Sequence, residues 1–211
     1  MPNSIAVLLS GRGTNMQAIH QSCASGKLQG SVTSVISDTP DAAGLTYAEQ
    51  HQIPTSVVDH RQHHSRADFD RALASVIDQY NPTIIALAGF MRVLSAEFTD
   101  HYQGRLINIH PSLLPRHRGL ETHQKALASG DRWHGCSVHF VSPKLDGGPL
   151  IARSVVPVLS NDTSQTLAQR VLDKEHRLFS AVLSMCLQGD CSQAGDAVFY
   201  RGSALRYPLT L

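Results

Sequence analysis

The chain has few cysteines, and those present are scattered along the sequence. Cys23, Cys136, Cys186 and Cys191 include no CxxC pair, the spacing on which many zinc sites and redox motifs depend. We therefore predict reduced thiols with structural or incidental roles, as expected in a reducing compartment.

Long apolar runs and targeting signals are also missing. No apolar run approaches the ~18–20 residues that a membrane-spanning helix requires. Residues 1–4 lead directly into an apolar segment, without the basic region, long apolar region and cleavage site of a signal peptide. We expect a cytoplasmic protein that does not act at a membrane.

Neither sign of charge is in excess. The 211 residues carry 18 Lys+Arg and 17 Asp+Glu, a formal net charge of +1. This balance argues against a protein that binds nucleic acid through its overall charge, so any phosphate site must be local. The apolar fraction of 42% is typical of a soluble globular chain, and the length favours a single domain over residues 1–211.

A metal-binding signature is absent although the chain has twelve histidines. The densest cluster, His60, His63 and His64, lies in a polar stretch without an HExxH or a paired Cys/His motif. We predict no metal site and interpret these histidines as solvated surface side chains.

Short apolar runs alternate with amphipathic segments, which predicts βαβ units. Strands are expected at 5–9, 32–36, 54–58, 83–88, 106–110, 137–141 and 151–158, and helices at 16–23, 42–51, 65–80, 95–102 and 163–187. The fold class is α/β: a Rossmann-like, mostly parallel twisted sheet of about seven strands flanked by helices. Residues 197–207 are predicted to be a short strand pair that closes the sheet.

A glycine-rich turn follows the first strand. Residues 10–15 read Ser-Gly-Arg-Gly-Thr-Asn, and free N–H groups at the start of the next helix favour an anion. Met16 stands where a dinucleotide fingerprint has its third glycine, and no Gly-Lys-Ser/Thr is present. The turn therefore suits a single phosphate, although a plain βα turn remains an alternative.

Two further motifs carry polar side chains to the same region. Asn108 and His110 share one face of the strand 106–110, near its carboxyl end, where open α/β sheets bind ligands. Asp146, in Asp-Gly-Gly, could orient His110, although this tripeptide is by itself a turn signal. Arg66 and Arg92 could bind a carboxylate, and Glu175-His176 inside a helix is typical of a solvated pair.

These strings resemble the formyltransferase family that uses 10-formyltetrahydrofolate. The resemblance rests on Ala-Gly-Phe-Met-Arg at 88–92, Ile-Asn-Ile-His-Pro-Ser-Leu-Leu-Pro at 107–115, Ser-Val-His-Phe-Val at 137–141 and Leu-Asp-Gly-Gly-Pro at 145–149. It covers roughly residues 5–190. The turn at 10–15 and the chain length narrow the resemblance to the purine-biosynthesis branch, which formylates glycinamide ribonucleotide.

The resemblance implies a role for each matching residue. Catalysis would fall to Asn108, His110 and Asp146. The acceptor would be held by Gly11, Gly13, Thr14, Asn15 and Glu175, and the folate by Arg66, Met91, Arg92, Val93, Leu94 and Asn108, with Ser137 and His139 in support. Residues 1–100 would then form a phosphate-binding half and 101–190 a folate and catalytic half.

The implied reaction is attack by an amine on the formyl carbon. Asn108 and protonated His110 would donate hydrogen bonds to the oxyanion of the tetrahedral intermediate, with Asp146 favouring the charged imidazole. The implied partners are glycinamide ribonucleotide and the formylfolate, a co-substrate, with no metal and no nucleic acid. A monomer or a homodimer is expected.

Other functions remain open on the sequence. A hydrolase that releases formate from the same folate shares the Asn-His-Asp set, although that family usually has a regulatory domain before the first strand. A tRNA formyltransferase would need a basic C-terminal domain. A non-catalytic mononucleotide-binding or NAD-dependent protein is a further alternative, because Asp38 after the second strand resembles a ribose-binding acid.

Overall fold

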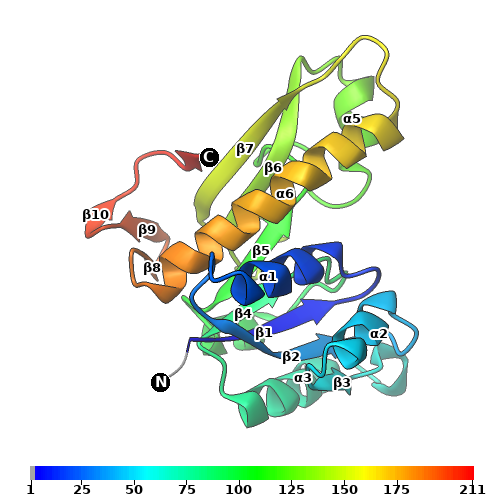
Figure 1. The fold of residues 1–211 in the computed structure, drawn as a ribbon, viewed down its shortest axis with the longest axis vertical. Helices are drawn as coiled ribbons and strands as arrows, with labels where there is room; N and C mark the ends of the chain where they lie inside the picture. The colour runs from blue at the N-terminus through cyan, green and yellow to red at the C-terminus, as the bar shows by residue number, and fades with distance from the viewer. Residues whose placement is uncertain (1–2) are drawn as a thin grey trace.

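Eight strands form the central sheet of the computed structural model, which describes residues 3–211 (Figure 1). Their order is β11-β7-β6-β5-β4-β1-β2-β3. The strands are β1 (Ser4–Leu9), β2 (Ser31–Ser37), β3 (Thr55–Val57), β4 (Ile84–Leu87), β5 (Leu106–His110), β6 (Trp133–Phe140), β7 (Leu150–Pro157) and β11 (Leu209–Thr210). Strands β1 to β5 pair in parallel, whereas β6 is antiparallel to β5 and β7. The predicted Rossmann-like, mostly parallel sheet is confirmed.

Helices cover both faces of this sheet. The first layer contains α1 (Thr14–Ala24), α2 (Ala43–Gln50) and α6 (Ser164–Leu187), and the second contains α3 (Arg66–Tyr80) and α4 (Ala96–His101). Strand side chains alternate between the two cores: Val7 and Leu9 pack with the α1 and α6 layer, and Leu8 packs with α3. This alternation follows from the two-residue period of a strand.

Local signals explain where the longest helices begin and end. The Ser65 hydroxyl accepts a hydrogen bond from Asp68 N at the start of α3. Thr163 and Thr166 form a reciprocal capping box at the start of α6, and Gly189, at φ +77°, follows its end. Capping side chains satisfy the free N–H groups of a first turn, and a left-handed glycine ends a helix without steric strain.

The C-terminal tail differs from the prediction. Strands β9 (Ala197–Tyr200) and β10 (Ser203–Ala204) do pair, but they join β8 (Cys191–Ala194) in a separate three-stranded sheet. Because β8 starts just after the turn that ends α6, the hairpin pairs with this local neighbour instead of closing the main sheet. The two residues of β11, too short to show a pattern in the sequence, extend the main sheet beside β7.

Two short elements were not predicted. Helix α5 (Thr122–Ala128) is too short to show a clear apolar period, and Glu121 at its start provides no side-chain cap. A 3-10 turn, η1 (His60–Gln62), contains the first histidine of the predicted surface cluster. None of the helices within residues 3–211 combines the length and the apolar character that a membrane span requires.

Candidate active site

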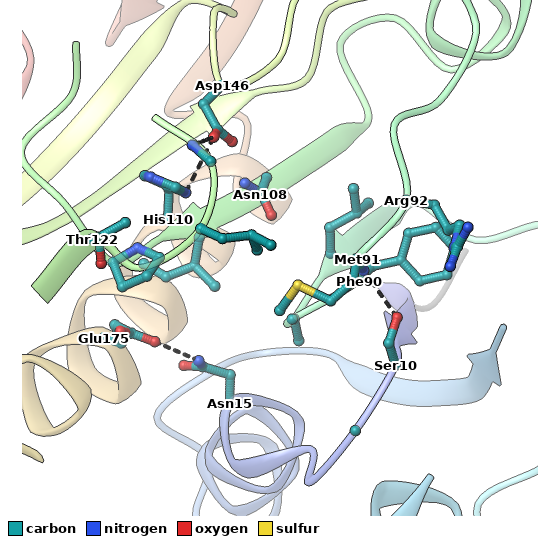
Figure 2. A pocket seen from close by; sticks show the side chains of 18 of the residues that line it. Ser10, Asn15, Phe90, Met91, Arg92, Asn108, His110, Thr122, Asp146 and Glu175 are labelled. Carbon is teal, nitrogen blue, oxygen red and sulfur yellow. Dashed lines mark hydrogen bonds and ion pairs between the residues drawn. The ribbon is translucent and has the colours of Figure 1, made fainter. Parts of the chain in front are cut away.

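A cavity of about 930 Å³ opens at the carboxyl ends of β1, β4 and β5. It brings together predicted residues from distant parts of the sequence, several of which are labelled in Figure 2. The predicted residues that line it are Gly11, Gly13, Thr14, Asn15, Met91, Arg92, Val93, Leu94, Asn108, His110, His139, Asp146 and Glu175. Two others, Arg66 and Ser137, do not line it.

The glycine turn is built by close approach of two backbones. Gly13 has φ +72°, and a Cβ there would lie 2.9 Å from Gly44 Cα. Gly44 N also donates to Gly11 O at 3.0 Å, which ties the turn to α2. The turn presents the N-terminus of α1 to the cavity, and its backbone N–H groups and partial positive charge suit an anion.

Asn108 is oriented by its cross-strand neighbour. Asn108 pairs with His139 in the β5–β6 ladder, and Asn108 Nδ2 lies 3.1 Å from His139 Nε2. The other ring nitrogen, Nδ1, lies 2.8 Å from Phe140 O, a group that can only accept. His139 therefore donates through Nδ1 and accepts through Nε2. Burial lowers the pKa of His139, which keeps the ring neutral and the Asn108 amide fixed.

His110 lies between a carboxylate and a backbone carbonyl. Its Nδ1 is 3.5 Å from Asp146 Oδ2, and its Nε2 is 3.0 Å from His117 O. Because a carbonyl only accepts, Nε2 carries a proton. The His110 side chain is 7% exposed and that of Asp146 is 10% exposed, and Figure 2 shows the two facing each other. The structure therefore brings Asp146 and His110 together, as an orienting role for Asp146 requires.

Glu175 is not the solvated residue that its helical position suggested. It is 7% exposed, and Asn15 Nδ2 donates to its Oε2 at 2.7 Å. Burial raises the pKa of Glu175, and the hydrogen bond from Asn15 opposes this shift. The pair joins α1 to α6 at the base of the cavity (Figure 2), so a carboxyl group is available to a ligand there.

Arg92 and Arg66 have different environments. Arg92 lines the cavity, and its Nε donates to the buried Asp38 Oδ2 at 3.0 Å. Asp38 does not line the cavity, so the pattern that resembled a ribose-binding acid forms an ion pair instead. Arg66 is exposed at the first position of α3, whose apolar face packs on the sheet and directs the helix start outward.

The histidine cluster at 60–64 does not converge on a site. His60 Nδ1 lies 2.9 Å from Asp38 O, and the His63 ring packs edge-on against Phe69. Across the described residues 3–211, no group of three or more His, Cys, Asp or Glu side chains is arranged to hold a metal ion.

Several cavity residues were missed by the sequence analysis. Gly119, Leu120, Thr122 and His123 belong to the segment after Pro115 and to the start of α5. The one local signal was Gly119, which has φ +74°. Exposed apolar side chains also line the cavity, namely Met91, Val93, Leu120 and Leu145. Such walls suit a flat aromatic ligand.

Ser137 lies outside the cavity lining and contacts the segment that follows β5. Its hydroxyl accepts from Leu114 N at 3.1 Å and donates to Ser112 O at 2.7 Å. These bonds fix the segment that leaves β5 after His110. The arrangement is consistent with the supporting role predicted for Ser137.

Known proteins resemble this chain in fold and in sequence over nearly its whole length. Phosphoribosylglycinamide formyltransferase of Escherichia coli K12 is 45% identical over 202 residues, covering 96% of this chain and 95% of that protein. The solved phosphoribosylglycinamide formyltransferase of Coxiella burnetii is 44% identical, with a TM-score of 0.96 and full coverage of both chains.

A more distant structure shares the fold alone. A formyltetrahydrofolate deformylase of Pseudomonas syringae is 21% identical, with a TM-score of 0.86 over 95% of this chain and 66% of that one. The sequence model described as Formyl transferase matches residues 3–183, which include all the cavity residues described above. The chain belongs to the formyl transferase family.

Proposed function

We propose that this enzyme transfers the formyl group of 10-formyltetrahydrofolate to the amine of 5-phosphoribosylglycinamide, yielding formylglycinamide ribonucleotide and tetrahydrofolate in de novo purine biosynthesis. The observation that carries the proposal is the convergence of Asn108, His110 and Asp146 in one cavity with the glycine turn of α1. The near-complete match to phosphoribosylglycinamide formyltransferases supports the same activity.

The acceptor fits the half of the cavity formed by α1 and α6. Its phosphate would bind at Gly11, Gly13 and Thr14, where the helix N-terminus offers N–H donors. Glu175 would receive a hydrogen bond from the glycinamide amine, and Asn15 would hold the Glu175 carboxyl in position. This arrangement directs the amine toward the catalytic residues.

The folate fits the opposite wall. Residues 91–94 and Leu145 supply apolar contacts for a flat ring, and Met91 N is held by Ser10 Oγ at 2.9 Å. The formyl group would then lie beside Asn108 and His110. Arg92 would remain paired with Asp38 while its aliphatic stem contacts the ligand.

The chemical step is direct attack without a covalent enzyme intermediate. The amine nitrogen attacks the formyl carbon, and the carbonyl oxygen becomes an oxyanion. This oxyanion would accept hydrogen bonds from Asn108 Nδ2 and from Nδ1 of protonated His110, because His110 Nε2 already donates to His117 O. One such donor typically contributes ~3 kcal/mol to the transition state. The proton lost by the amine reaches the leaving folate nitrogen through water or through the His110–Asp146 pair.

The test is consumption of 10-formyltetrahydrofolate by the purified protein, with and without glycinamide ribonucleotide. Consumption that requires the acceptor and yields formylglycinamide ribonucleotide is the expected result. Release of formate without acceptor would identify a hydrolase instead, and absence of turnover with either would contradict both activities.

The proposal also includes the location, the partners, the metal requirement and the oligomeric state that the sequence predicts. The enzyme would act in the cytoplasm on two small molecules, without a nucleic-acid or membrane partner. It would require no metal, because the amine and the folate supply both reacting groups. It would work as a monomer or a homodimer.

A further inference from the structure

The backbone between Pro111 and Thr122 contacts both members of the catalytic pair. His117 O accepts from His110 Nε2 at 3.0 Å, and Gly119 N donates to Asp146 Oδ2 at 2.8 Å. These two bonds approach the pair from the same loop, two residues apart. The position of this backbone therefore affects the orientation of both side chains.

The loop has a conformation that it would not adopt alone. His117 has φ +51° and Glu121 has φ +58°, on either side of Gly119 at φ +74°. A left-handed conformation is unfavourable for a residue with a Cβ. Such a conformation persists only where surrounding contacts hold it.

Asp131 provides those contacts at the centre of the loop. Its Oδ1 accepts from Arg116 Nη2 at 2.6 Å, and its Oδ2 lies 2.8 Å from His117 Nε2. The Asp131 side chain is only 7% exposed, and each of its oxygens has a partner. Asp131 follows α5 and precedes β6, and neither it nor the side chains of Arg116 and His117 line the cavity.

We propose that Asp131 is a positioning residue: by holding Arg116 and His117, it fixes the loop backbone that orients His110 and Asp146. This inference deepens the proposed formyl transfer and rests on it. Asp131 touches no ligand in this scheme, so it acts on the rate of the chemical step and not on the acceptor's phosphate site.

The remaining loop contacts limit the size of the effect. Ser137 holds Ser112 and Leu114, and the Ser112 hydroxyl donates to Arg116 O at 2.6 Å. These contacts fix the first half of the loop when Asp131 is removed. His117 then loses its side-chain anchor. Apart from its bonds to the catalytic pair, the backbone between His117 and Gly119 keeps one hydrogen bond within residues 3–211, from Lys125 Nζ to Arg118 O at 3.3 Å. Because a misplacement of ~1 Å costs up to ~10²-fold in rate, a decrease in kcat of about 10- to 100-fold is expected.

The first experiment compares Asp131→Ala with Asp162→Ala. Asp162 is an equally enclosed carboxylate: its side chain is 2% exposed, and it pairs with Arg170 at 2.8 Å, away from the loop. Both variants should lose stability. Only Asp131→Ala should lose kcat, with the KM for glycinamide ribonucleotide changed less than threefold. Equal kcat values for the two variants would overturn the proposal.

A second pair of variants tests the contact without removing a buried charge. His117→Gln retains a side-chain donor for Asp131, and His117→Met has similar length but no donor. The expected result is near-normal kcat for His117→Gln and at least a fivefold lower kcat for His117→Met. Identical kcat values for the two would overturn the proposal, even where Asp131→Ala fails to fold.

Hydrogen exchange separates this inference from the proposed function. In the protein without substrates, the Gly119 amide should exchange faster in Asp131→Ala and His117→Met than in the wild type and Asp162→Ala, because its bond to Asp146 is lost. Unchanged exchange would overturn the anchoring role whatever the substrate is. Failure of the wild type to formylate glycinamide ribonucleotide would instead refute the proposed function.

Discussion

The Asn15 amide donates a 2.7 Å hydrogen bond to Glu175 Oε2, joining the first turn of α1 to the middle of α6 across 160 residues of sequence. Glu175 is buried, and the other Asn15 side-chain atom, Oδ1, is buried without a hydrogen-bond partner among the described residues. A buried acceptor without a partner is unfavourable. A ligand N–H group at this position would satisfy it, as the amide of glycinamide would.

Replacing Glu175 with Gln should weaken acceptor binding. The variant keeps the size of the side chain and an acceptor for Asn15, but it loses the charge that favours an amine. Hydrogen bonds to charged groups contribute ~1.5–3 kcal/mol, so kcat/KM for glycinamide ribonucleotide should fall by about 10- to 100-fold. Steady-state kinetics at varied acceptor concentration checks this, and an unchanged kcat/KM would exclude a role for the carboxylate.

The same variant should change how stability depends on pH. The pKa of Glu175 is raised above its ordinary value of 4.5 by burial, so the folded chain holds this proton more tightly than the unfolded chain. The contribution of Glu175 to the stability of the wild type therefore falls as pH rises from 4.5 through the folded pKa. Glu175→Gln lacks this loss, so its stability relative to wild type should be greater at pH 8 than at pH 5. Urea unfolding at both values measures the difference, and a constant difference would contradict it.

Asp146→Asn should reduce turnover by ~10²-fold or more while the protein stays folded. The amide oxygen still accepts from Gly119 N, but the negative charge facing His110 Nδ1 is lost. The circular dichroism spectrum should match that of the wild type. Near-normal kcat would exclude this role for the carboxylate.

Strand alternation made part of the site predictable. Asn108 and His110 were placed on one face because side chains alternate in a strand, and the β5–β6 register places His139 and Ser137 opposite them. Glycine content likewise indicated the turn before α1. These features depend on local sequence and on the general position of ligands in α/β sheets.

The loop that faces His110 was not predictable in the same way. Its left-handed residue His117 is held by Asp131, fourteen residues later, and this contact leaves no local pattern. Burial of Glu175 was equally hidden from a helical pattern, because it depends on Asn15 in another helix. Arg66 was assigned to the folate by resemblance, but its place at the exposed start of α3 keeps it outside the cavity lining.

Two neighbouring glycines should tolerate alanine very differently. At Gly13 a Cβ would approach Gly44 Cα to 2.9 Å, and φ is +72°, whereas at Gly11 no atom lies within 4 Å of a built Cβ. Gly13→Ala should therefore lose about 1–3 kcal/mol of unfolding free energy. Gly11→Ala should stay within ~0.5 kcal/mol of the wild type. Urea titration of the two variants measures this difference, and equal losses would contradict the close approach of α1 and α2.

The Arg92–Asp38 pair allows a test of the alternative interpretation, in which Asp38 is a ribose-binding acid. The Asp38 side chain is 2% exposed and Arg92 is 41% exposed, so solvent weakens their attraction. Arg92→Ala leaves a buried carboxylate whose one further cationic candidate within residues 3–211 is His60, with Nδ1 at 3.7 Å. The loss should be about 1–3 kcal/mol, below the ~3–5 kcal/mol of a fully buried pair. In Arg92→Ala/Asp38→Asn the charge is gone, so the double variant should be more stable than Arg92→Ala. Additive losses in this cycle would mean that Asp38 does not depend on Arg92 and is available to another partner, as a ribose-binding acid requires.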